Sequence, residues 1–208
     1  APSAAASVVG SSSAGDTPEN RRFAELMAKL ATANRTIERF APVTEAMLTT
    51  PPPGDWINWR RTRDGHGDSP LDQLAWTFAL PDGVNEPTPL VHDGIMFVLA
   101  PGGRLVALDA ATGSFIWDYR YALPSGGKVP VAPVRNIALY GTSLILATPD
   151  AALVAVDART GKQLWRTQEA DPKDGFTHTA GPIIAHGVVI AGMNGCERFK
   201  KTPCFVAG

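Results

Sequence analysis

The sequence of 208 residues predicts an all-β fold built from repeated four-stranded sheets, a β-propeller, and three observations support this. A segment recurs, because residues 105–113 read LVALDAATG and residues 153–161 read LVAVDARTG. Asp109 and Asp157 in these copies are 48 positions apart, a period suited to one four-stranded blade. The 20 glycines and 18 prolines fit a chain with many turns. A single blade cannot bury both of its faces, so we expect the blades to stack side by side.

The chain begins with a segment of small residues, 1–16, rich in Ala, Ser and Gly, which we expect to be disordered. Its first residue is Ala, and the segment resembles the mature end that remains when a secretory signal peptide has been removed. On this basis we expect an exported, periplasmic protein.

Residues 17–53 are predicted to form a helical extension on the outside of the main fold. Thr17 suits a helix N-cap and Pro18 the first helical position. Apolar residues then follow at helical spacing and continue less regularly: Phe23, Leu26, Met27, Leu30, Ile37 and Phe40. The sequence PPPG at 51–54 is expected to end this extension.

Residues 54–208 are predicted to form the propeller part of the chain. Alternating apolar residues predict strand pairs at 89–98, 137–146 and 182–190. In each repeat the Asp and the Thr-Gly supply a tight turn, and the Trp that follows covers the seam to the next blade. Asp109 and Asp157 are therefore expected to be turn residues and not catalytic bases.

The third copy of the repeat is incomplete. Residues 205–207 are in register with 153–155, but the Asp, the Thr-Gly and the Trp do not follow. We therefore expect about three blades here, as part of a longer propeller whose remainder is a necessary partner.

Several function classes are disfavoured by composition and motifs. The formal net charge is −1, so no basic field indicates nucleic-acid binding. No apolar run approaches the roughly 18 residues of a membrane span. No G-x-G-x-x-G lies between a strand and a helix, which argues against a nicotinamide enzyme. The four histidines lack ligand spacing and are expected at turns or on the surface: His66, His92, His178 and His186.

The chain has two cysteines, Cys196 and Cys204, with no CxxC motif and no nearby His, so they cannot form a four-ligand zinc site. In an oxidising compartment they would close a small loop, which is worth roughly 2–3 kcal/mol. Two unrelated buried thiols are the alternative.

The repeat Ala-x-Asp-x-x-Thr-Gly-x-x-x-Trp resembles the tryptophan-docking motif of the quinoprotein alcohol dehydrogenases that depend on pyrroloquinoline quinone (PQQ), the methanol/ethanol dehydrogenase family. Propellers of that family have eight blades. Residues 54–61 (GDWINWRR) and 69–73 (SPLDQ) resemble the segment that leads into its first blade, although the family usually has several more residues before 74–76. A non-enzymatic periplasmic propeller that binds or assembles other proteins is the alternative, because such proteins carry similar repeats.

The resemblance implies a cofactor site on two segments. Glu86, in NEPTP, matches a glutamate that contacts the quinone; without the resemblance it would be a solvated loop carboxylate. Residues 192–197 (GMNGCE) resemble the segment beneath the cofactor, which has PQQ-lining residues and a ligand of Ca²⁺ or a lanthanide. The lining residues would be Asn194, Gly195 and Cys196, and the metal ligand would be Glu197. Gly195 is expected to let the backbone approach a flat ligand, and Glu197 has the alternative of an exposed charged residue.

Two further positions align with PQQ-binding residues. Thr179 matches a threonine that binds a quinone carboxylate, and Arg135 lies at or next to an arginine that binds the cofactor, with a surface arginine as the alternative. The adjacent cysteines of methanol dehydrogenases are absent from residues 129–133 (VPVAP), so the chain resembles a branch that lacks that disulfide. In this branch we expect a Cys196–Cys204 disulfide instead.

The resemblance implies oxidation of a small alcohol to an aldehyde or ketone, with PQQ and a metal ion, and transfer of electrons to a cytochrome c or similar acceptor. The family's base aspartate lies in later blades, so no catalytic residue is expected in this chain. The piece alone is expected to be inactive.

Overall fold

The structure of the chain, a computed structural model, describes Pro18, Arg21, Arg22, Glu25 and residues 34–58, 74–126, 135–196 and 203–208. The four single residues are helical, as expected for the start of the extension. The expectations for residues 1–16 and 69–73 lie outside the described residues.

The first sheet is a complete four-stranded antiparallel blade. Its strands follow the chain order, β1 (Leu90–His92), β2 (Ile95–Ala100), β3 (Arg104–Asp109) and β4 (Phe115–Arg120). Strand β3 is almost wholly buried, and its apolar residues accordingly follow one another without alternating with polar ones. Such burial on both faces is what a strand needs when its blade lies between neighbours.

The second sheet repeats the first with the same order, β5 (Ala138–Tyr140), β6 (Ser143–Thr148), β7 (Ala152–Asp157) and β8 (Gln163–Gln168). The copies agree in detail, because the register shifts between Ala107 and Leu108 in the first sheet and between Ala155 and Val156 in the second. The 48-residue period therefore reproduces the irregularity of each blade as well as its strands.

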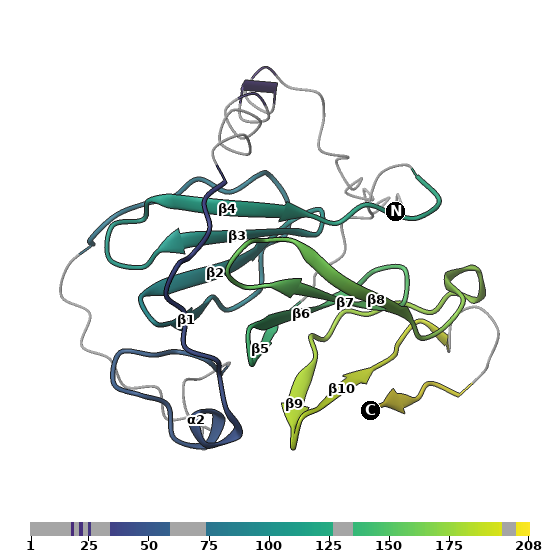
Figure 1. Ribbon diagram of the computed structural model, residues 1–208. Coiled ribbons are helices and arrows are strands. Elements are labelled where there is room, and N and C mark those ends of the chain that lie inside the picture. The colour runs from purple at the N-terminus through teal and green to yellow at the C-terminus, as the bar shows by residue number, and fades with distance from the viewer. Residues whose placement is uncertain are drawn as a thin grey trace, which may run out of the picture.

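The third sheet has three described strands, β9 (Ile183–Ala185), β10 (Val188–Gly192) and β11 (Val206–Ala207). Strand β11 pairs with the end of β10, with Gly192 opposite Val206. Ala185 faces Val188 as Tyr140 faces Ser143, so Gly192 has the place of Ala147, whose partner is Leu153. Val206 therefore takes the place of Leu153, one residue away from the register that the repeat predicted. The three sheets follow one another in chain order across the molecule (Figure 1).

Tryptophans join the successive blades as predicted. The Trp117 indole of the first blade donates to the Ala158 carbonyl in the second, at 3.1 Å, and its ring covers Gly161. Trp76 binds the Ala110 carbonyl of the first blade in the same way, at 3.0 Å. Apolar residues of the first two sheets share one core.

Asp109 holds the turn on which such a tryptophan docks. Its Oδ1 accepts hydrogen bonds from the backbone of Ala111 and Thr112 and from the Thr112 hydroxyl. These hydrogen bonds lower the pKa of Asp109 below its ordinary value, and the bond from the Thr112 hydroxyl has the largest effect. Asp157 makes equivalent bonds to Arg159 and Thr160, so both aspartates are turn residues, as expected.

The helical stripe expected to continue through Ile37 and Phe40 does not do so. Residues 34–43 are not helical, and the Ile37 amide donates to the Arg159 carbonyl of the second blade at 2.9 Å. Ile37 is buried in the shared core, and Phe40 packs against it. An extended segment gains this burial because it can cross two blades, whereas a helix would contact one narrow surface.

The segment then forms the short helix α2 (Glu45–Thr49) and adds residues to the inner blade edges. Val43 pairs with Gly141, and Trp56 pairs with Val91 of β1. Figure 1 shows this purple segment descending past the first two sheets to α2. The described N-terminal segment therefore binds the two blades together.

His92 is buried, contrary to the expectation of a turn or surface position. Its Nδ1 lies 2.6 Å from Asp55 Oδ2, and its Nε2 lies 2.7 Å from the Ala41 carbonyl. The imidazole therefore joins β1 to two points of the N-terminal segment, which spacing along the sequence cannot reveal.

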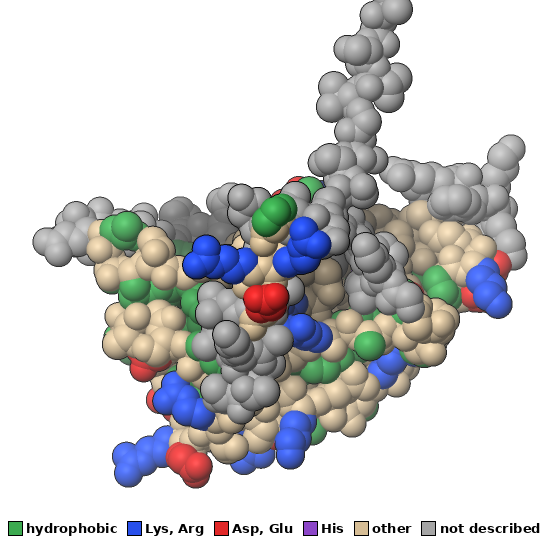
Figure 2. Space-filling view, turned by 90° about the horizontal axis from the view of Figure 1, so that it is seen from above, with side chains coloured by type: hydrophobic (Ala, Val, Ile, Leu, Met, Phe, Trp, Pro, Cys, Tyr) green, Lys and Arg blue, Asp and Glu red, His purple; other side chains and the backbone are tan. Residues whose placement is uncertain are grey.

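On the face in Figure 2, Lys and Arg side chains are scattered and do not form one continuous patch. No helix in the described part of the chain is long and apolar enough to cross a membrane.

Candidate functional site

Three candidate residues lie in the loops that lead into the inner strands. Glu86 precedes β1, Arg135 precedes β5 and Thr179 precedes β9, each by three or four residues. The three sheets repeat the same topology, so these loops emerge at equivalent edges of successive blades. Residues distant in sequence are thereby brought side by side.

Arg135 connects the other two loops. Its Nε lies 3.4 Å from Glu86 Oε2, and its backbone amide donates to the Thr179 carbonyl at 3.1 Å. The side chains of Arg135 and Glu86 are 56 % and 43 % exposed. An ion pair this exposed is worth about 0–1 kcal/mol at most, so stability alone gives little reason for the pair.

Asn194 extends the connection to the third sheet. Its Nδ2 donates to the Thr179 hydroxyl at 3.0 Å, and its backbone exchanges two hydrogen bonds with Thr177. Its Oδ1 is buried and has no hydrogen-bond partner among the described residues. An unsatisfied buried acceptor costs about 1–3 kcal/mol, and a donor on a bound ligand would remove that cost.

A cavity of about 480 Å³ opens beside these loops. It is lined by Glu86, Arg135, Asn136, Ala180, Gly181 and Ile183. This volume lies within the range of about 300–1,000 Å³ usual for small-molecule sites. The Arg135 guanidinium, which can bind a ligand carboxylate through several N–H groups, lines this cavity together with the Glu86 carboxylate and apolar surface.

The walls of this cavity are held by close packing between two loops. The Asn136 side chain accepts from the Gly181 amide at 2.9 Å and donates to the Pro182 carbonyl at 3.2 Å. A Cβ on Gly181 would overlap the Asn136 carbonyl, so glycine is required for the two loops to approach.

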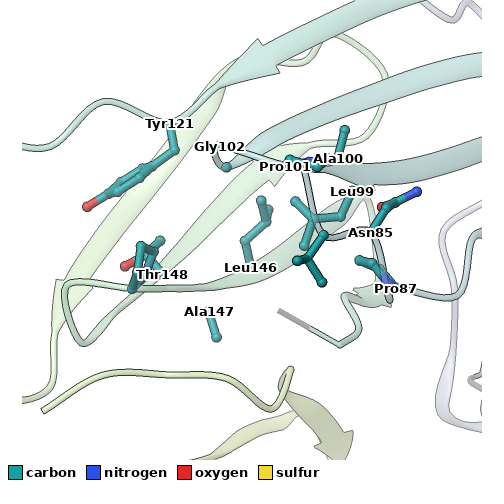
Figure 3. A pocket seen from close by; sticks show the side chains of 13 residues that line it. Asn85, Pro87, Leu99, Ala100, Pro101, Gly102, Tyr121, Leu146, Ala147 and Thr148 are labelled. Carbon is teal, nitrogen blue, oxygen red and sulfur yellow. The ribbon is translucent and has the colours of Figure 1, made fainter. Parts of the chain in front are cut away.

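A second hollow, between the first two blades, is too small for a cofactor. Figure 3 shows Asn85 and Pro87 near one end of it and Tyr121 and Thr148 near the other. Its volume of about 30 Å³ has room for about two water molecules. The loop that carries Glu86 therefore packs on apolar blade surface through Asn85 and Pro87.

A buried polar network closes the far end of this small hollow. Tyr121 donates to Asp150 at 2.7 Å, and Arg166 and Thr148 also donate to that carboxylate. Burial raises the pKa of Asp150, but these hydrogen bonds outweigh it and hold the pKa below its ordinary value. Burial raises the pKa of Tyr121. The network joins the first blade to the second.

Cys196 and Cys204 form a disulfide, eight positions apart. Cys196 is completely buried, and neither it nor Gly195 lines the cavity described above. Gly195 has a φ of +87°, and an added Cβ would overlap the carbonyl of Gly175, which lies in the loop between β8 and β9. The glycine thus allows two protein loops to meet. Contact of Gly195 and Cys196 with PQQ stays a prediction.

Glu197, the expected metal ligand, lies outside the described residues. Among the residues that the structure describes, no group of three or more His, Cys, Asp or Glu could hold a metal ion. Within the described residues, the candidate site is therefore the chain of contacts from Glu86 through Arg135 and Thr179 to Asn194.

His178 was expected at a turn or on the surface and is instead completely buried. It lies between Thr177 and Thr179, with its ring against Glu169 and the Gly192 carbonyl. Sequence reasoning missed this residue because its partners are nine and fourteen positions away and have no motif in common with it.

The sequence of this chain is similar to those of known proteins. Residues 68–198 match the family model described as outer membrane protein assembly factor BamB. Quinoprotein alcohol dehydrogenase PedH of Pseudomonas putida is 35 % identical over 148 residues, which are 64 % of this chain and 25 % of PedH.

Two solved structures have the same fold. Quinohemoprotein alcohol dehydrogenase from Comamonas testosteroni superposes with a TM-score of 0.61 at 30 % identity, over 82 % of this chain and 27 % of that one. A europium-containing methanol dehydrogenase gives 0.59 at 25 % identity, over 72 % and 29 %. The chain thus spans about a quarter of the relatives that it matches.

Proposed function

Because this chain belongs to the family of PQQ-type quinoprotein alcohol dehydrogenases, we propose that it supplies part of the cofactor site of an enzyme that oxidises an alcohol to an aldehyde or ketone. The observation that carries the proposal is the contact chain from Glu86 to Asn194, because it links four predicted cofactor residues from three blades, and two of them, Glu86 and Arg135, line one cavity.

The chemistry of these residues suits PQQ, a flat tricarboxylate. Arg135 uses its Nε toward Glu86 and one terminal nitrogen toward the Thr179 carbonyl, at 3.5 Å. A guanidinium has five donors, so it can bind a ligand carboxylate while keeping both contacts. The Thr179 hydroxyl accepts from Asn194 and can donate its own hydrogen to a second carboxylate oxygen.

PQQ, when bound, supplies the quinone that accepts the hydride of the alcohol. Within this chain, Glu86 and Arg135 would orient the ligand, and the Asn194 Oδ1 would accept from it. Gly195 and Cys196 would border it farther along the same segment. Glu197 would provide an oxygen ligand to Ca²⁺ or a lanthanide.

The remaining parts of the proposal rest on the family. The substrate would be a small alcohol, the acceptor a cytochrome c or similar protein, and the compartment the periplasm. The Cys196–Cys204 disulfide supports an oxidising compartment. The catalytic base and the other metal ligands would come from blades beyond this chain.

The test is a PQQ titration of the full-length protein, freed of cofactor, in the presence of Ca²⁺ or La³⁺. Arg135→Ala should weaken PQQ binding about 10-fold or more, because a charge-assisted hydrogen bond is worth about 1.5–3 kcal/mol. Arg120→Ala is the matched control, since Arg120 is also half-exposed and paired with a carboxylate, Asp118, but lies on the outer strand β4. Equal effects of the two variants would contradict the assignment of Arg135.

A binding or assembly propeller is the second candidate, favoured by the description of the matching family model. It predicts no saturable binding of PQQ by the full-length protein and no alcohol oxidation with any metal. The titration therefore separates the two functions before any variant is made.

A further inference from the structure

His178 is a fully buried imidazole between a backbone carbonyl and a carboxyl group. Its Nδ1 lies 3.0 Å from the Gly192 carbonyl oxygen, and its Nε2 lies 2.8 Å from Glu169 Oε2. The second contact is an ion-pair contact and not an aligned hydrogen bond. The Gly192 carbonyl can only accept, so Nδ1 donates to it, and Nε2 is left for the contact with Glu169.

The position of His178 couples it to the proposed cofactor site. Neighbouring side chains alternate in an extended segment, so Thr177 and Thr179 lie on one side and His178 on the other. On the first side Thr179 accepts from Asn194, and on the second His178 binds Gly192, two residues before Asn194. The segment is thereby fastened to the end of β10 on both sides.

Glu169 connects this arrangement to the second blade. It follows β8 directly, and its backbone amide donates to the Ala151 carbonyl at 3.0 Å. The His178–Glu169 contact therefore fixes the segment against a neighbouring sheet as well as its own. A buried ion pair adds little to stability once desolvation is counted, so fixing a local geometry is the stronger reason for the pair.

We infer that His178, held by Glu169, is a positioning residue for the cofactor: it sets the Thr179 hydroxyl and the Asn194 amide in the geometry that binds the ligand. The expected effect of His178 on PQQ binding rests on the proposed function. The positioning itself is a property of the cofactor-free protein and can be measured there.

The first measurement is hydrogen–deuterium exchange of the full-length, PQQ-free protein and its variants. His178→Gln keeps much of the side-chain volume, but its single amide nitrogen cannot occupy both ring-nitrogen positions, so at most one of the two contacts is kept. We expect faster exchange in peptides covering 176–180 and 192–194, and no change in the first blade. His186→Gln is the control, because His186 lies exposed in the β9–β10 turn and should alter neither region.

Glu169→Gln provides a conservative rescue. A glutamine amide can donate to His178 Nε2 while Nδ1 donates to Gly192, so the contacts are kept without charge. This variant should retain wild-type exchange and bind PQQ within about twofold of the wild type. His178→Gln should bind PQQ about 10-fold more weakly, the lower end of what loss of a supporting hydrogen bond costs.

A double-mutant cycle tests whether His178 acts through Thr179. Thr179→Val alone should weaken PQQ binding, and adding His178→Gln should cause little further loss, because the hydroxyl that His178 positions is already gone. Additive losses would overturn the inference, as would unchanged exchange at 176–180 in His178→Gln. Faster exchange throughout the protein would also overturn it, since His178 would then support the whole fold. Absence of PQQ binding by the wild type would refute the proposed function, while the exchange data would still decide the positioning.

Discussion

The docking of Trp117 on Gly161 predicts that Gly161→Ala destabilises the protein by an amount that can be separated into two parts. The first part is backbone strain, since Gly161 has a φ of +70°. An L-residue in this left-handed region costs about 1–2 kcal/mol. The second part is a clash, because an added Cβ would lie 2.7 Å from Cε3 and 2.9 Å from Cδ2 of Trp117.

The clash cannot be relieved cheaply. Carbon atoms pack at about 3.5–4.0 Å, so the indole would have to move by about 1 Å. Trp117 is completely buried, and its Nε1 is bound to the Ala158 carbonyl at 3.1 Å. Overpacking of this kind costs about 1–3 kcal/mol, which brings the expected loss to about 2–5 kcal/mol.

Gly141→Ala is the matched control. Its φ is +58°, also in the left-handed region, but no atom lies within 4 Å of the added Cβ. Backbone strain alone should therefore cost about 1–2 kcal/mol there. Urea unfolding of the full-length protein and both variants, followed by circular dichroism, gives the three free energies of unfolding. If Gly141→Ala costs as much as Gly161→Ala, the tight contact between the tryptophan and the next blade is refuted.

Two further predictions concern stability. Because hydrogen bonds hold the pKa of Asp150 below its ordinary value, its contribution to the free energy of unfolding should be fully present above about pH 4 and decrease as the pH falls through the lowered pKa. Tyr121→Phe removes one donor to this carboxylate and brings the pKa of Asp150 closer to its ordinary value. Urea unfolding between pH 2.5 and 7 should therefore show a smaller acid-induced loss in the variant, ending at a higher pH, and an unchanged profile would contradict this. Cys204→Ser, at an exposed position, should lower the free energy of unfolding by about 2–3 kcal/mol, and the same loss should appear when the wild type is unfolded with reductant; equal stability with and without reductant would show that the disulfide is absent or contributes nothing.

The propeller could be predicted from the sequence because the same strand and turn residues occur in two copies, one for each complete blade. Asp109 and Asp157 stand at equivalent turns of successive blades, and Trp76 and Trp117 each dock on the turn of the following blade, as the spacing predicts. Trp165, the equivalent residue of the second blade, is 40 % exposed. The register of the third sheet differs by one residue from the predicted copy, because Val206 has the place of Leu153 and not of Val154. The sequence is compatible with a Cys196–Cys204 disulfide or with two unrelated buried thiols, and the structure has the disulfide.

What the sequence did not predict depends on partners that lie outside the repeat. Ile37 and Phe40 fit a helical stripe, but the same apolar residues bury more surface when extended across two blades. His92 and His178 are buried because each finds an acidic side chain and a backbone carbonyl at distant positions. Spacing identifies neither set of partners, and an isolated histidine is otherwise more common at a surface.

The candidate site is formed where the repeat permits variation. The loop before each inner strand has an equivalent position in every blade, but it contains a carboxylate in the first, a guanidinium in the second and a hydroxyl in the third. The turn aspartates are satisfied by their own backbone. Arg135, by contrast, keeps donor capacity toward a cavity, and Asn194 keeps a buried acceptor without a partner among the described residues. A fold that repeats its backbone while varying this one loop gathers unlike chemical groups at one edge, which is what recognition of an asymmetric, carboxylate-bearing ligand requires.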